Sequence, residues 1–217
     1  MTSKRTFAIM ILTLLFSFST FAASGETKNI QLPSPQTDGG KPLMQALKDR
    51  HSSRSFSARE ISQQTLSNLL WAAFGINRPD SDKRTAPSAL NWQEIDIYVA
   101  TANGLYLYQA EDHSLQLVTT QDVRAKTGTQ AFVEQVPINL VYVADYSRMG
   151  TASPEKKDFY SAADTGFIGQ NVYLYCASEG LATVVRNSID KPALAEAMKL
   201  RTEQKIILAQ SVGYPED

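Results

Sequence analysis

An apolar run rich in β-branched residues reads Ile138-Asn139-Leu140-Val141-Tyr142-Val143-Ala144-Asp145. Such a run is typical of a strand that is buried on both faces of a sheet. The longest helical pattern of the chain follows at residues 156–179 and ends at Gly180. Its small residues allow another helix to approach closely, which fits the core of a monomer or the centre of a dimer: Ala162, Ala163, Gly166, Gly169 and Ala177.

Further helices and strands are predicted on both sides of this centre. Helices are expected at 42–50, with Leu43, Ala46 and Leu47 as the apolar face, and at 62–74, 121–134 and 192–198. Strands are expected at 94–101, 105–109, 115–119, 181–185 and 205–212, and residues 77–90 read as a polar loop. Because a hairpin and helix pairs interrupt the alternation of strand and helix, the pattern favours an α+β fold over a doubly wound sheet.

The N-terminus has the pattern of a secretory signal peptide. Lys4 and Arg5 precede an apolar run at 7–21, and small residues follow it, so residues 1–23 are predicted to be removed on export. Residues 24–40 are polar and hold two prolines, which predicts a flexible leader before a folded domain at 41–217. The expected location is therefore periplasmic or secreted.

Composition excludes several classes of function. Lys and Arg total 21 and Asp and Glu total 22, and this balance gives no support to a general role on nucleic acid or a membrane surface. The single cysteine, Cys176, lies in an apolar helical pattern and is expected to be a small buried hydrophobe. His51 and His113 stand in no pattern of paired metal ligands, so no metal site is expected.

Residues 50–56 are the first candidate for binding. Arg50 and Arg54 stand four residues apart, with Ser52 between them, and at helical spacing they share one face. Two planar guanidiniums and a hydroxyl could hold a phosphate through charge-assisted hydrogen bonds. The segment also fits an ordinary helix end, where arginines interact favourably with the helix dipole.

Two further polar segments follow. Residues 84–93 combine a proline turn, small residues and two amides just before a strand, which suits the edge of a flat heterocycle or a plain surface turn. Residues 180–188 lead from a strand into a polar loop.

Taken together, these segments resemble the nitroreductase family. Arg50, Ser52 and Arg54 are similar to its Arg-x-Ser-x-Arg/Lys motif. The later matches follow in the family's order: Pro87-Ser88-Ala89-Leu90-Asn91-Trp92-Gln93, then Asp164-x-Gly166 with Gln170-Asn171, then Gly180-Leu181-Ala182-Thr183, and finally Gly213-Tyr214-Pro215. The hairpin with Tyr106, Tyr108 and His113 is closer to the branch near the SagB-type dehydrogenases.

The resemblance implies an α+β nitroreductase-like fold with a mostly antiparallel sheet flanked by helices, and a homodimer that binds FMN at its interface. Arg50, Ser52 and Arg54 would hold the phosphate and ribityl chain, with His51 beside them through its backbone. Ser88, Ala89, Asn91 and Gln93 would come from the partner subunit. Val185, Arg186, Asn187 and Ser188 would pass along the flavin ring, with a backbone N–H near Asn187 directed at N5.

The implied activity is an exported, FMN-dependent oxidoreductase that transfers hydride through flavin N5, with no side chain assigned as a catalytic acid or base. NADH and NADPH, the family's usual donors, are cytosolic, so the donor and acceptor stay open. Two alternatives remain: a secreted descendant that has lost FMN and serves as a binding or scaffold dimer, and a SagB-like oxidation of peptide heterocycles.

Overall fold

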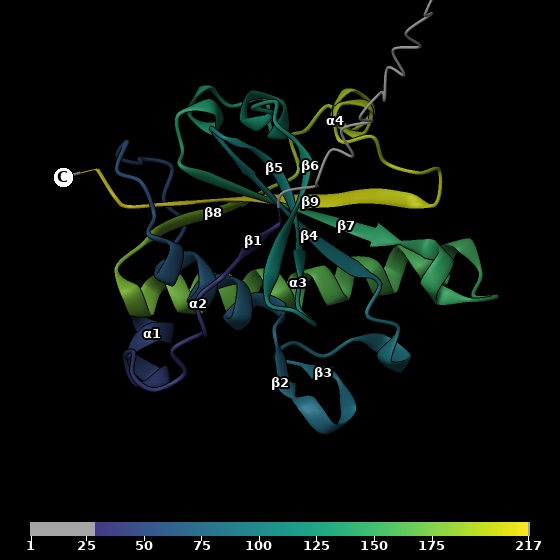
Figure 1. The fold of residues 1–217 in the computed structure, drawn as a ribbon, viewed down its shortest axis with the longest axis horizontal. Coiled ribbons are helices and arrows are strands. Elements are labelled where there is room, and N and C mark those ends of the chain that lie inside the picture. The colour runs from purple at the N-terminus through teal and green to yellow at the C-terminus, as the bar shows by residue number, and fades with distance from the viewer. Residues whose placement is uncertain (1–28, 217) are drawn as a thin grey trace, which may run out of the picture.

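The computed structural model describes residues 29–216. The predicted signal peptide at 1–23 lies outside these residues. Among the residues described, no helix is both long and apolar enough to cross a membrane. The chain forms one large antiparallel sheet with helices packed on both faces (Figure 1). The α+β class and the predominantly antiparallel sheet expected from the sequence are confirmed.

The elements lie close to their predicted positions. The sheet consists of β1 (Ile30–Gln31), β4 (Ile95–Thr101), β5 (Gly104–Gln109), β6 (Ser114–Thr119), β7 (Ile138–Asp145), β8 (Ala182–Arg186) and β9 (Gln204–Gly213). The α-helices are α1 (Leu43–Asp49), α2 (Gln63–Phe74), α3 (Pro154–Glu179) and α4 (Lys191–Ala197). The strand order is β1-β6-β5-β4-β7-β9-β8, and each of these pairings is antiparallel.

The strand β7 lies inside the sheet, between β4 and β9, and every one of its residues is buried. This explains why β7 is apolar from Leu140 to Ala144, because both of its faces are covered. The helices α2 and α3 cover one face of the sheet, and α4 covers the other (Figure 1). On the first face, Leu69, Ile168 and Val172 are fully buried.

The helix α3 ends at Gly180 as its sequence predicts and begins at Pro154, two residues before the predicted start. Ser153 caps its start, because the Ser153 hydroxyl accepts a hydrogen bond from the backbone N–H of Lys156, and Pro154 occupies the first turn. Gly180 ends the helix in the left-handed conformation, at φ 70°. This long helix is the element that positions the polar segments described below.

Three local predictions are wrong. Residues 121–134 form two short 3-10 turns, Arg124–Thr127 and Ala131–Glu134, in place of a helix. The segment 77–90 contains part of a small hairpin of β2 (Ile76–Arg78) and β3 (Lys83–Arg84), which projects from the body (Figure 1). On α1 only Ala46 is buried, so most of the predicted apolar face is open to solvent.

Part of the predicted flexible leader is built into the sheet instead. Ile30 and Gln31 pair with β6, and Leu32 is buried against the core. The His113 imidazole joins this arm to the hairpin and to α2: Nε2 lies 2.7 Å from Ser67 Oγ, which donates to the Pro33 carbonyl. Burial lowers the pKa of His113, which favours the neutral ring.

Candidate functional site

Residues 50–56 leave the C-terminal end of α1 and lie against the edge strand β8. The backbone N–H of Ser53 donates to the carbonyl of Thr183 on β8, at 2.9 Å. His51 turns back, and its Nδ1 lies 2.8 Å from the carbonyl of Asp49. The segment is therefore fixed by its backbone, while the side chains of Ser52 and Arg54 are exposed.

Tyr173 on α3 connects this segment to β8. Its hydroxyl lies 2.8 Å from Ser52 Oγ and 3.0 Å from the backbone nitrogen of Val185. The guanidinium of Arg50 lies over the Tyr173 ring, 5.3 Å from its centre. Two of the three predicted segments thus meet at one side chain that the sequence analysis did not single out.

The charge at residues 50–54 is positive. Within residues 29–216, no ion pair involves Arg50 or Arg54. The nearest acid along the chain, Asp49, pairs with Lys41 at 2.9 Å, and this hydrogen bond lowers the pKa of Asp49. The two guanidiniums are therefore free to bind an anion.

The last residues described in the chain support the same segment. Phe56 packs against Gly213, where an added Cβ would lie 3.2 Å from the Phe56 ring. The backbone N–H of Ser57 donates to the Tyr214 carbonyl, and the Arg59 guanidinium lies 3.9 Å from the centre of the Tyr214 ring. A side chain at this glycine would crowd both Pro137 and the Phe56 ring, so the glycine of the Gly-x-Pro match favours the close approach of Phe56.

The end of β8 places only some of its predicted residues at the surface. Asn187 and Ser188 are exposed and Val185 is half-buried. Arg186 turns inward instead: its side chain is 6% exposed and donates to the Thr127 carbonyl at 2.7 Å and to Asn139 Oδ1 at 2.9 Å. The Arg186 guanidinium therefore braces the core, and only its backbone faces the predicted site.

Residues 88–93 form a tight loop with an unusual backbone. Leu90, Asn91 and Gln93 all have positive φ, at 51°, 56° and 47°. Such conformations cost free energy in residues other than glycine, so they persist only where surrounding contacts hold them. Ser88 Oγ accepts the backbone N–H of Gln93 at 2.8 Å, which closes the loop on itself.

Hydrogen bonds with charged side chains fix the backbone and the Gln93 side chain of this loop. The backbone N–H of Ala89 donates to Asp164 on α3, at 2.9 Å. Arg84 donates to the Gln93 side-chain oxygen and Arg148 to its carbonyl, at 2.8 and 2.9 Å. Glu94 is fully buried, and burial together with the charge of Asp164 raises the pKa of Glu94.

Two hollows border the exposed side of the loop. One of about 370 Å³ is lined by Asn91, Trp92 and Gln93 together with residues of β4 and β5. A second of about 240 Å³ lies between the loop and the β2–β3 hairpin. Amide, aromatic and charged side chains thus line the open space next to Asn91 and Gln93, and such a mixed lining can bind a polar molecule.

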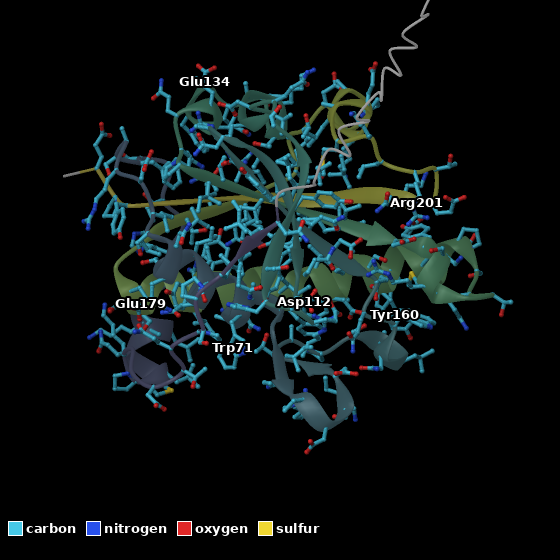
Figure 2. The ribbon with its side chains drawn as sticks, in the orientation of Figure 1. Trp71, Asp112, Glu134, Tyr160, Glu179 and Arg201 are labelled. Carbon is cyan, nitrogen blue, oxygen red and sulfur yellow. The ribbon has the colours of Figure 1, made fainter. Side chains whose placement is uncertain are left out.

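Within one chain, this loop and the 50–54 segment lie apart. Trp92 contacts Tyr160 edge to face, with ring centres 5.8 Å apart, so the loop lies toward the start of α3. Figure 2 shows Tyr160 and Glu179 toward opposite ends of this helix. Asp164 and Tyr173, the helix contacts of the two segments, are separated by nine residues, about 13 Å along the axis.

Sequence reasoning missed Tyr173, Asp164 as a loop anchor and buried Glu94. No sequence motif marks Tyr173, because its partner Ser52 lies 121 positions away along the chain. Glu94 carried no such signal, because strand alternation puts it on the side of Asp96, opposite the apolar face of Ile95 and Ile97.

Comparisons with known proteins agree on one family. Residues 47–214 match the family model described as Nitroreductase family. The chain is similar to a candidate nitroreductase of Ralstonia eutropha, with a TM-score of 0.84 and 42% identity over 89% of this chain and 92% of that one. A candidate nitroreductase of Methanocaldococcus jannaschii is 28% identical, covering 82% of this chain and 92% of its own.

A more distant likeness concerns the fold alone. The NADPH:FMN oxidoreductase of Vibrio harveyi, solved with NAD⁺, superposes with a TM-score of 0.60 at 20% identity. The match covers 81% of this chain and 69% of that one.

Proposed function

Because the chain belongs to the nitroreductase family, we propose that it is an FMN-dependent oxidoreductase acting on small-molecule donors and acceptors. The observation that carries the proposal is the cationic segment at 50–54, which the Ser53 backbone and the Tyr173 hydroxyl join to β8. A clamp for an anion is thereby set beside a strand end, as a phosphorylated ring compound requires.

The donor set fits the phosphate of FMN. Arg50 and Arg54 supply planar, permanently charged forks, and Ser52 supplies a hydroxyl, while Asp49 is neutralised by Lys41. The buried side chain of Arg186 does not contact the flavin in this proposal. The exposed backbone around Asn187 lies beside the flavin ring instead.

The flavin, when bound, supplies the two-electron redox chemistry, and the protein supplies position and electrostatics. Arg50, Ser52 and Arg54 hold the phosphate end. The backbone from Val185 to Ser188 orients the ring, and a donor N–H near Asn187 favours negative charge that develops there. No described side chain is needed as an acid or base, so solvent supplies the proton.

The proposal includes a homodimer whose second copy brings residues 88–91 to the clamp. The separation along α3 supports this, since one chain does not bring its own loop to Tyr173. Exposed apolar side chains on α1 and α3 support it as well. Leu43 is 62% and Met44 75% exposed, and Phe159 and Phe167 are exposed too.

The proposal also includes export. It rests on the pattern at residues 1–23, which lie outside the described part of the chain. An exported enzyme lacks ready access to cytosolic NADH and NADPH, so we leave the electron donor open within the class of small molecules.

The test is the binding of FMN to the purified domain, measured by the quenching of flavin fluorescence. The double variant Arg50→Ala, Arg54→Ala removes two charge-assisted contacts of about 1.5–3 kcal/mol each. We therefore expect FMN affinity to fall about 100-fold or more. The control Lys126→Ala, Lys205→Ala removes the same charge from exposed positions elsewhere and leaves FMN affinity unchanged.

Failure of the wild-type protein to bind added FMN would overturn the enzyme proposal. The chain would then be a family member whose fold serves binding or scaffolding. Equal FMN affinity in the wild type and the double variant would instead remove residues 50–54 from the site while leaving the flavin assignment intact.

A further inference from the structure

The Tyr173 hydroxyl makes two hydrogen bonds that differ in what they allow. The backbone nitrogen of Val185 carries a hydrogen and can only donate, so the Tyr173 oxygen accepts at 3.0 Å. The second partner, Ser52 Oγ at 2.8 Å, can donate or accept. The direction of this second bond decides which hydrogen remains for a ligand.

The hydrogen bond from the Val185 N–H favours one direction for the bond between Tyr173 and Ser52. Among the residues described, Ser52 Oγ is the one acceptor that lies within hydrogen-bonding distance of the Tyr173 O–H group. If Ser52 donated instead, the phenolic hydrogen would lose its protein partner. The Tyr173 O–H therefore donates to Ser52, and the chain runs from the Val185 N–H through Tyr173 to Ser52.

This direction leaves the Ser52 hydrogen directed outward. Ser52 is exposed, and its neighbours Arg50 and Arg54 also present donors. The Tyr173 side chain thus contacts both a charge and a hydroxyl of the clamp, because the Arg50 guanidinium lies over its ring and Ser52 binds its hydroxyl. The three groups all donate, and they bind a charged phosphate, with its several acceptor oxygens, more strongly than a neutral hydroxyl.

We propose that Tyr173 is a positioning residue that makes the site selective for phosphorylated flavin over riboflavin, by holding Ser52 as a hydrogen-bond donor. The inference rests on the proposed function and adds to it the residue that sets the cofactor's class. Tyr173 acts through Ser52 and Arg50.

The test is a comparison of FMN and riboflavin affinities in Tyr173→Phe, which keeps the ring beneath Arg50 and removes only the hydroxyl. We expect FMN affinity to fall about tenfold, or about 1.4 kcal/mol. Riboflavin affinity should change less than twofold, because riboflavin lacks the phosphate that Ser52 addresses. Adding Ser52→Ala to Tyr173→Phe should lower FMN affinity little further, since both changes remove the same contact.

Tyr175→Phe is the matched control. Tyr175 lies on the same helix, but its hydroxyl donates to the Thr65 carbonyl of α2, at 3.4 Å. This variant should leave both affinities unchanged. Thermal unfolding of each variant reports whether the fold is intact.

The possible outcomes distinguish a failure of the role of Tyr173 from a failure of the proposed function. Unchanged FMN affinity in Tyr173→Phe, with a wild type that binds FMN, overturns the inference and leaves the proposed function standing. Equal losses for FMN and riboflavin also overturn it, because they indicate a structural role. A wild type that binds neither flavin overturns the proposed function itself.

Discussion

Replacing Gly128 with alanine tests the interior role of Arg186. The Gly128 backbone is extended, at φ −177°, so alanine causes no backbone strain there. Its Cβ would collide with Arg186 Nη1 and would lie 2.8 Å from Gln130 Oε1. The buried guanidinium must therefore move away, and its 2.7 Å hydrogen bond to the Thr127 carbonyl is lost.

The free energy of unfolding should fall by a moderate amount. A lost hydrogen bond to a buried charged group costs about 1.5–3 kcal/mol. Alanine recovers about 0.4–1 kcal/mol, because it restricts the unfolded chain more than glycine does. The net loss is about 1–2 kcal/mol, which lowers the melting temperature by about 2–8 °C for a domain of this size.

Urea denaturation of four proteins measures the effect: the wild type, Gly128→Ala, Arg186→Leu and the double variant. If the collision with Arg186 is the cause, Gly128→Ala costs little when leucine occupies position 186, so the two changes are strongly non-additive. Additive losses, or a Gly128→Ala variant as stable as the wild type, would refute the reasoning.

Two further predictions concern buried Glu94 and the long helix α3. The pKa of Glu94 is raised in the folded state, so the folded protein holds this proton more tightly than the unfolded chain does. Protonation of Glu94 therefore stabilises the fold fully below about pH 4.3, the ordinary pKa of glutamate. This stabilisation is lost as the pH rises through the pKa of Glu94 in the folded state. Glu94→Gln should therefore melt at a higher temperature than the wild type at pH 8, with an advantage that shrinks toward pH 4, and a difference independent of pH would contradict this. Nothing lies within 4 Å of a Cβ added to Gly166 in a single chain, so Gly166→Ala should stabilise α3 by about 1 kcal/mol while weakening a dimer packed against it. Sedimentation should show a dimer dissociation constant raised about tenfold, that is by about 1.4 kcal/mol, and an unchanged constant would place α3 outside the interface.

The strongest periodic signals predicted their elements well. The strand β7 and the helix α3 each carry a pattern that depends only on neighbouring residues, so the sequence suffices to identify them. The segment 121–134 fails for a non-local reason. At Gly128 the chain must stay extended beside the Arg186 side chain, which is 58 positions further along the sequence, and a helix cannot continue through it.

The sequence motifs of the candidate site could be predicted, but the hydrogen bonds that join these motifs to the rest of the fold could not. The arginines and serines of 50–54 stand out by residue type. Arg186 looked equally available, because nothing in a strand pattern shows that its guanidinium meets Thr127 and Asn139. Tyr173 lies 121 positions from Ser52, and only the folded chain brings their hydroxyls together.

The short strand β1 has a consequence for how the domain can be shortened. The family match begins at residue 47, so a design guided by it would discard Ile30 and Gln31. The backbone of Ser114 and Leu115 would then lie open at the rim of the sheet, where a strand of another molecule can add to it. Those few residues therefore guard against sheets of separate molecules joining into aggregates.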